Sequence, residues 1–74
     1  MTPHTEQFLI WSWEHLAWWN PQHRGYTEQL ALAGRYSFED AADIVIGHIP
    51  AGEEVAVLEA DALRRGCPRS YPAR

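Results

Sequence analysis

The sequence predicts an α+β domain, with a small antiparallel sheet of about three strands in the order β-β-α-β and one helix packed on a face. Residues 8–14 are rich in aromatic and β-branched residues, and residues 53–60 alternate between apolar and polar side chains. Residues 37–49 place apolar residues at helical spacing behind a capping serine. With 74 residues and one cysteine, the chain is expected to form a single domain without an internal disulfide.

The first strand is expected over residues 8–14, where apolar residues occupy both faces. This pattern favours a central strand that is covered on each side by an element of the chain, or on one side by a partner protein. Extended segments are expected at residues 18–19 and 26–27, separated by Pro21, and a single helical turn at residues 28–33. The first two strands are therefore expected to form an antiparallel pair.

The helix is expected from Ser37 to Ile49. Ser37 is a favourable N-cap, and Asp40 three residues later completes a variant of the capping box. The apolar face expected to pack on the sheet consists of Phe38, Ala41, Ala42, Val45 and Ile49. Pro50 and Gly52 then end the helix.

The last strand is expected from Glu53 to Ala60, at or near an edge of the sheet. Residues 1–61 contain all ten acidic residues and two of the six arginines, and they are expected to form the folded acidic domain. Residues 62–74 contain four arginines and no acidic residue, and they are expected to form a mobile tail.

The charge distribution favours a protein partner over nucleic acid. The net charge is −4 and the chain has no lysine, so the acidic domain is expected to repel phosphates and to attract a basic protein surface. No run of about 18 apolar residues exists, which predicts that the chain does not span a membrane. The start of the chain lacks the basic residues of a secretory signal, and the single cysteine favours the cytoplasm.

An acidic surface is the first candidate site. It consists of Glu39, Asp40, Asp43, Glu53 and Glu54, and none of the helical acids has a lysine or arginine four residues later. Such a surface can imitate the phosphates of a nucleic acid and bind the basic groove of a nucleic-acid-binding complex. The alternative is an ordinary solvated helix face whose acids complement the helix dipole.

An aromatic contact is the second candidate site. Trp11 and Trp13 are expected to form the core, whereas Trp18 and Trp19, beside Arg24, are expected to be exposed and to anchor a protein partner. The alternative is a platform on which a nucleotide stacks, although few cations are available to bind its phosphate.

Catalytic residues, metals and cofactors are not expected. His15 and His23 lie eight residues apart and lack the spacing of a zinc site, so His15 is expected to be a buried, hydrogen-bonded histidine. His48 is expected near the end of the helix, where its charge is favourable. The chain has no glycine-rich phosphate loop and no arguable pair of nucleophile and base, so we do not expect an enzyme.

Four segments carry a family resemblance: Ile10–His15, Trp18–Pro21, Gly25–Thr27 and Ala33–Ala41. Over residues 8–46 they resemble a group of small phage and prophage proteins that share the pattern IWSxEHxxWWxPxxxGYT…AGxYSxEEA. The resemblance implies an accessory phage protein and carries no reaction with it. At the level of class, the chain is similar to the small acidic anti-CRISPR proteins that phages use against host defence.

Three functions are compatible with these observations. The first is a phage-encoded inhibitor of bacterial defence, such as an anti-CRISPR, that binds a Cas protein or surveillance complex in the cytoplasm of the infected host and blocks access of nucleic acid. The second is a small binding protein that sequesters a nucleotide signal. The third is a structural or regulatory phage module, for which a homodimer is one expected form.

Overall fold

The computed structural model describes residues 6–47 and 53–70. These residues form an antiparallel sheet of four strands and two α-helices, which confirms the predicted α+β class. The elements are β1 (Phe8–Ser12), β2 (Ala17–Trp19), β3 (Tyr26–Thr27), α1 (Phe38–Gly47), β4 (Glu54–Leu58) and α2 (Glu59–Arg65), with short 3-10 turns at Pro21–His23, Leu30–Leu32 and Pro68–Ser70. The structure has one strand and one α-helix more than the sequence predicted. Within the described ranges, no helix has the length and apolar character needed to cross a bilayer.

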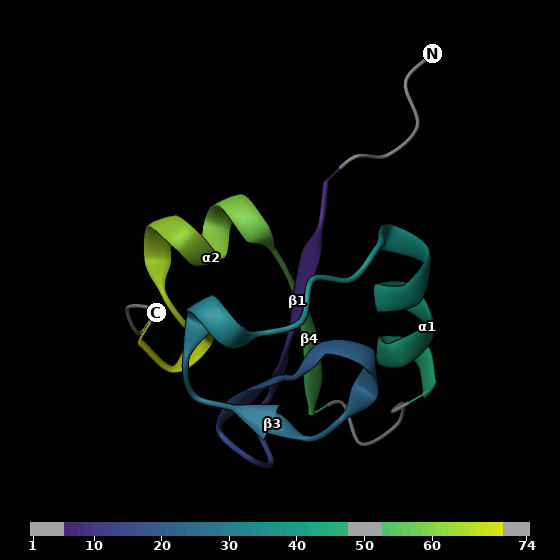
Figure 1. The fold of residues 1–74 in the computed structure, drawn as a ribbon, viewed down its shortest axis with the longest axis horizontal. Helices are drawn as coiled ribbons and strands as arrows, with labels where there is room; N and C mark the ends of the chain where they lie inside the picture. The colour runs from purple at the N-terminus through teal and green to yellow at the C-terminus, as the bar shows by residue number, and fades with distance from the viewer. Residues whose placement is uncertain (1–5, 48–52, 71–74) are drawn as a thin grey trace.

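The strand β1 lies inside the sheet, whose strand order is β3-β2-β1-β4. The helices α1 and α2 lie on opposite sides of β1 and β4 (Figure 1). Alternate residues of β1 therefore contribute to two separate cores: Leu9 and Trp11 to the core on the α2 side, and Ile10 to the core on the α1 side. This arrangement confirms the prediction of a central strand covered on both faces.

Tryptophan side chains supply much of both cores. The core on the α2 side consists of Leu9, Trp11, Trp18, Ala33, Val57 and Ala62. The core on the α1 side consists of Ile10, Trp19, Tyr36, Ala41 and Ile44. The rings of Trp11 and Trp18 meet edge to face, with centroids 5.1 Å apart, which is a favourable geometry for aromatic pairs.

The helix α1 begins as the sequence predicts. The Ser37 hydroxyl accepts a hydrogen bond from the Asp40 amide at 3.1 Å, which confirms the N-cap. The predicted core face is partly wrong, because the buried residues are Ala41 and Ile44 whereas Phe38 is 47% exposed. The end of the predicted helix, including Ile49, lies outside the described residues.

The helix α2 replaces the predicted end of the last strand. β4 ends at Leu58 and α2 follows directly, so the predicted strand extends two residues too far at its end. Ala62 of α2 is completely buried, and the partly buried Cys67 packs against the same core. The predicted domain boundary at residue 62 thus falls inside a helix, and residues 71–74 of the predicted tail lie outside the described residues.

Gly34 lies where two backbone segments come unusually close together. Its amide donates to the Trp19 carbonyl at 2.8 Å. A Cβ atom at this position would lie 2.8 Å from the Cα of Pro21 and 2.8 Å from the ring of Tyr36. The Tyr36 hydroxyl in turn donates to the Asn20 carbonyl. Only a residue without a side chain fits at this crossing.

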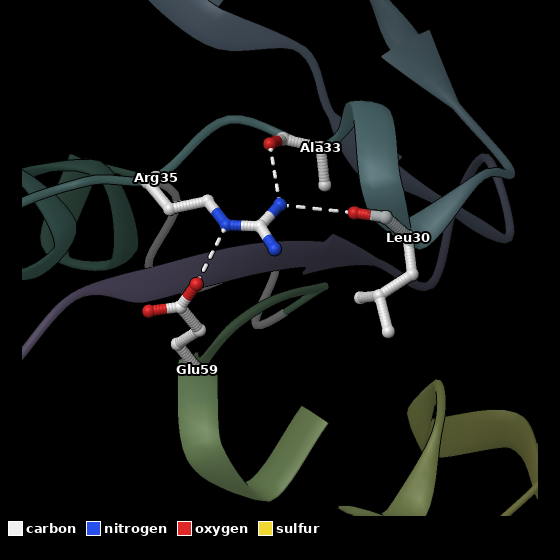
Figure 2. A network of polar contacts seen from close by, with 4 residues as sticks. All are labelled: Leu30, Ala33, Arg35 and Glu59. Carbon is white, nitrogen blue, oxygen red and sulfur yellow. Dashed lines mark hydrogen bonds and ion pairs between the residues drawn. The ribbon is translucent and has the colours of Figure 1, made fainter. Parts of the chain in front are cut away.

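Arg35 joins two segments of the chain through three polar contacts (Figure 2). Its Nη1 donates to the carbonyl oxygens of Leu30 and Ala33, both at 2.9 Å. Its Nε lies 3.0 Å from a carboxylate oxygen of Glu59, the first residue of α2. The guanidinium therefore fastens the turn before α1 to the beginning of α2, using the forked donor geometry that lysine lacks.

Candidate functional site

An apolar groove lies between α1 and β4. Its volume is about 380 Å³, within the range of protein binding pockets. The walls include Phe38, Ala42, Val45 and Ile46 of α1 and Val55 and Ala56 of β4. We call this feature the α1–β4 groove.

The groove exists because α1 carries more apolar residues than the core can cover. Ala41 and Ile44 face the core. The neighbouring apolar side chains of α1 lie above the edge of the sheet and line the groove. Ile46 is 64% exposed as a result. The short side chains of Ala42 and Ala56 leave the space between helix and strand unfilled. An exposed apolar area of this kind commonly marks a site of protein contact.

Acidic side chains border the groove on α1. Glu39, Asp40 and Asp43 are all exposed, and none pairs with an arginine or histidine of the described residues. At 100° per residue, Glu39 and Asp43 come next to Ile46 around the helix. The helix itself contains no basic residue, so no side chain of α1 neutralises the negative charge at this border.

The two acids of the predicted surface that lie at the start of β4 are less exposed than the acids of α1. Glu53 is half-buried, and Glu54 is only 6% exposed, packed beside the groove where β4 pairs with Ser12. The expectation that Glu54 belongs to a solvated acidic face is therefore wrong. The sequence reasoning placed Glu54 by its charge alone, whereas the ladder with β1 turns its side chain toward the α1 face.

The predicted burial is confirmed for Trp11 and is wrong for the other three tryptophans. Trp18 is 1% exposed and Trp19 is 9% exposed, so neither can anchor a partner on the surface. Trp13, which was expected in the core, is 42% exposed because the chain turns at residues 13–16. Arg24 is exposed as expected, at the end of the turn that follows β2. The burial of Trp18 and Trp19 also removes them from any nucleotide-stacking platform.

A small exposed aromatic pair lies where β1 turns into β2. The His15 ring stacks on Tyr26 with centroids 3.9 Å apart, and its Nε2 lies 3.8 Å from a carboxylate oxygen of Glu14. His15 is exposed, so the prediction of a buried histidine is wrong. Desolvation raises the pKa of the Tyr26 hydroxyl, and the charges of Glu54 and Glu14 raise it further.

The described part of the chain contains no group of three or more histidine, cysteine or acidic side chains placed to hold a metal ion. His4 and His48 lie outside the described residues. Two smaller cavities, of about 140 and 170 Å³, lie beside Trp11 with Cys67 and beside Leu58 with Glu59. Neither brings together an arrangement that resembles a catalytic site.

Comparison with known proteins identifies no relative: no family model, no curated protein and no solved structure matches the chain. The α1–β4 groove and its acidic border are the features of the described structure that indicate a function. Sequence reasoning found the acids of α1 but missed the groove. The available signal was the number of apolar residues in α1, which occupy a wider arc than one buried face requires.

Proposed function

We propose that this chain is a non-catalytic binding protein that docks on a basic surface of a partner protein. The observation that carries this proposal is the α1–β4 groove, an exposed apolar hollow bordered by acids that form no ion pair with the residues that the structure describes. The acids would steer a basic partner to the groove, and apolar side chains would supply most of the contact energy.

We further propose that the partner belongs to a bacterial defence system, as the resemblance to phage proteins implies. The most specific form is an anti-CRISPR that binds a Cas effector or surveillance complex in the cytoplasm of the infected cell. Glu39, Asp40 and Asp43 would occupy a basic groove that otherwise holds nucleic acid, while Phe38 and Ile46 would contact apolar residues beside it. In this mechanism the chain itself does not bind nucleic acid.

The test is to count phage plaques on a CRISPR-immune host with and without this protein. The proposal predicts that expression of the protein restores plaques on a host with one CRISPR type. A triple variant with Glu39→Gln, Asp40→Asn and Asp43→Asn should lose this effect, because it removes the three exposed acids of α1, two of which border the groove, without changing side-chain size. Glu28→Gln is the matched control, since Glu28 is an exposed acid that follows β3 at the opposite edge of the sheet.

A binding measurement completes the test. The affinity of the protein for the affected Cas complex should fall steeply as salt rises, because exposed charges are screened. Immunity that stays intact across CRISPR types would refute the anti-CRISPR assignment. A triple variant that inhibits as well as the unmodified protein would refute the role of the acidic border.

A further inference from the structure

We propose that the partner contributes an extended segment that adds to β4 as a fifth strand, with basic residues flanking alternate apolar ones. This inference rests on the proposed function, since it specifies how a basic protein partner is held. It follows from three features of the described residues: the free edge of β4, the position of the α1–β4 groove along it, and the acids of α1.

The backbone of β4 has hydrogen-bonding groups available at its outer edge. Phe8 of β1 exchanges two hydrogen bonds, both of 2.8 Å, with Tyr36 on the side away from β4. Successive residues of a strand direct their N–H and C=O groups to opposite sides. Trp11 lies three residues after Phe8, so its N–H and C=O groups are directed toward Val55 of β4. Ala56, the next residue of β4, therefore directs its N–H and C=O away from β1.

Ala56 is exposed, and its backbone groups have no hydrogen-bond partner among the residues that the structure describes. β4 is also the last strand in the order β3-β2-β1-β4. An edge strand in this state is a template for another strand. The opposite edge of the sheet is formed by β3, which has only two residues and offers a much shorter template.

The α1–β4 groove lies along this same edge. A strand added to β4 would lie about 4.8 Å from it and would direct every second side chain toward the α1 side of the sheet. Those side chains would enter the apolar groove beside Val45 and Ile46. The small side chain of Ala56 leaves room for them. Main-chain hydrogen bonds would then supply affinity and the groove would select apolar residues at alternate positions.

The charge of α1 identifies the partner. Glu39 and Asp43 border the groove, so arginine or lysine residues flanking the apolar positions would be attracted to them. A second copy of this chain is disfavoured, because antiparallel pairing of two β4 strands would bring two acidic α1 helices together on one face of the joined sheet. The observations therefore favour a different, basic protein over a homodimer.

The test uses a synthetic peptide of sequence Arg-Arg-Val-Thr-Val-Thr-Val-Arg-Arg and the full chain. Calorimetry should detect binding, and the peptide with glutamate in place of each arginine should bind about tenfold more weakly or not at all. The exchange of the Ala56 amide hydrogen should slow when the peptide is bound. Ala56→Pro should abolish binding, because it removes an N–H that faces away from β1 and so breaks no hydrogen bond of the fold. Ala42→Phe should weaken binding by filling the groove.

Two further peptides decide the outcome even where a variant of the protein fails to fold. One carries N-methyl groups on the three valines and the other carries them on the two threonines. Only one of these sets can face β4, so one peptide should lose binding and the other should keep it. Equal binding of both, no binding of the unmodified peptide, or a dimer in sedimentation that Ala56→Pro dissociates would overturn strand addition.

Failure here is distinguishable from failure of the proposed function. A protein that restores plaques but does not bind the peptide keeps its inhibitory role and loses the strand-addition mechanism. A protein that binds the peptide but leaves immunity untouched keeps strand addition and loses the assignment to host defence.

Discussion

Replacing Arg35 tests whether a single guanidinium holds the turn before α1 to α2. Arg35→Met keeps most of the aliphatic stem and removes all three polar contacts, those to the carbonyls of Leu30 and Ala33 and to the Glu59 carboxylate. Arg35→Lys keeps the charge but cannot reproduce the forked geometry.

The magnitude follows from the burial of these groups. A hydrogen bond that involves a charged group contributes about 1.5–3 kcal/mol, and the 23% exposure of the Arg35 side chain favours the lower end. The two carbonyl contacts then contribute about 3 kcal/mol together. The pair with Glu59, which is 33% exposed, contributes about 1 kcal/mol or less. We expect Arg35→Met to lower the free energy of unfolding by about 3 kcal/mol and Arg35→Lys by about half as much.

The assay is thermal and chemical denaturation followed by circular dichroism. In a domain of this size a loss of about 3 kcal/mol lowers Tm by roughly 12–24 °C. Arg64→Met is the matched control, since the Arg64 side chain is 71% exposed and its one ion pair with a described residue is that with Asp61 along α2. It should change the free energy of unfolding by less than about 0.5 kcal/mol. Equal melting of the Arg35→Met and Arg64→Met variants would refute the reasoning.

Three other measurements test the fold. Gly34→Ala should lower the free energy of unfolding by about 1–3 kcal/mol, because the added methyl group meets the two segments that cross there; an unchanged denaturation midpoint would contradict this packing. Trp18→Ala should cost about 3–5 kcal/mol and leave little folded protein, whereas Trp13→Ala should cost far less; a reversed order in urea denaturation would contradict the exposures described. The raised pKa of Tyr26 means that the folded state favours the neutral hydroxyl. The contribution of this preference to the free energy of unfolding is therefore present below the unfolded pKa of 10.0. It is lost as pH rises through the pKa of Tyr26 in the folded state. Tyr26→Phe should remove this part of the alkaline loss, and Glu54→Gln should reduce it, as measured by denaturation at increasing pH.

Local features of the fold could be predicted from the sequence. The cap at Ser37 depends on a hydroxyl and an amide three residues apart, so a short segment determines it. The apolar residues on both faces of the segment around Ile10 likewise predicted a central strand, and β1 contributes to both cores. The signals for α2 were also present, with Glu59 and Asp61 in its first turn and Gly66 after its end. Alternation that continued to Ala60 led to the prediction of a strand instead.

Features that depend on tertiary placement could not be predicted. Trp13 and Trp18 have the same chemistry, and only the position of the turn between β1 and β2 decides which of them is buried. The same limit applies to the candidate site. Phe38 belongs to an apolar helical face, but whether that face meets the sheet or overhangs its edge depends on how α1 lies over β4. Periodicity contains no information on that position.

The pairing of β1 with β4 has a consequence for how the protein is made. Leu58 pairs with Phe8, which is synthesised 50 residues earlier, so β1 exists for the synthesis of these 50 residues before its second neighbouring strand is complete. Until then Leu9 and Trp11 lack the partner strand that completes their core, and the nascent chain on the ribosome presents an unpaired apolar strand edge. The pairing of β1 can therefore be completed only after β4 has been synthesised, and any truncation before β4 removes the strand on which both halves of the domain depend.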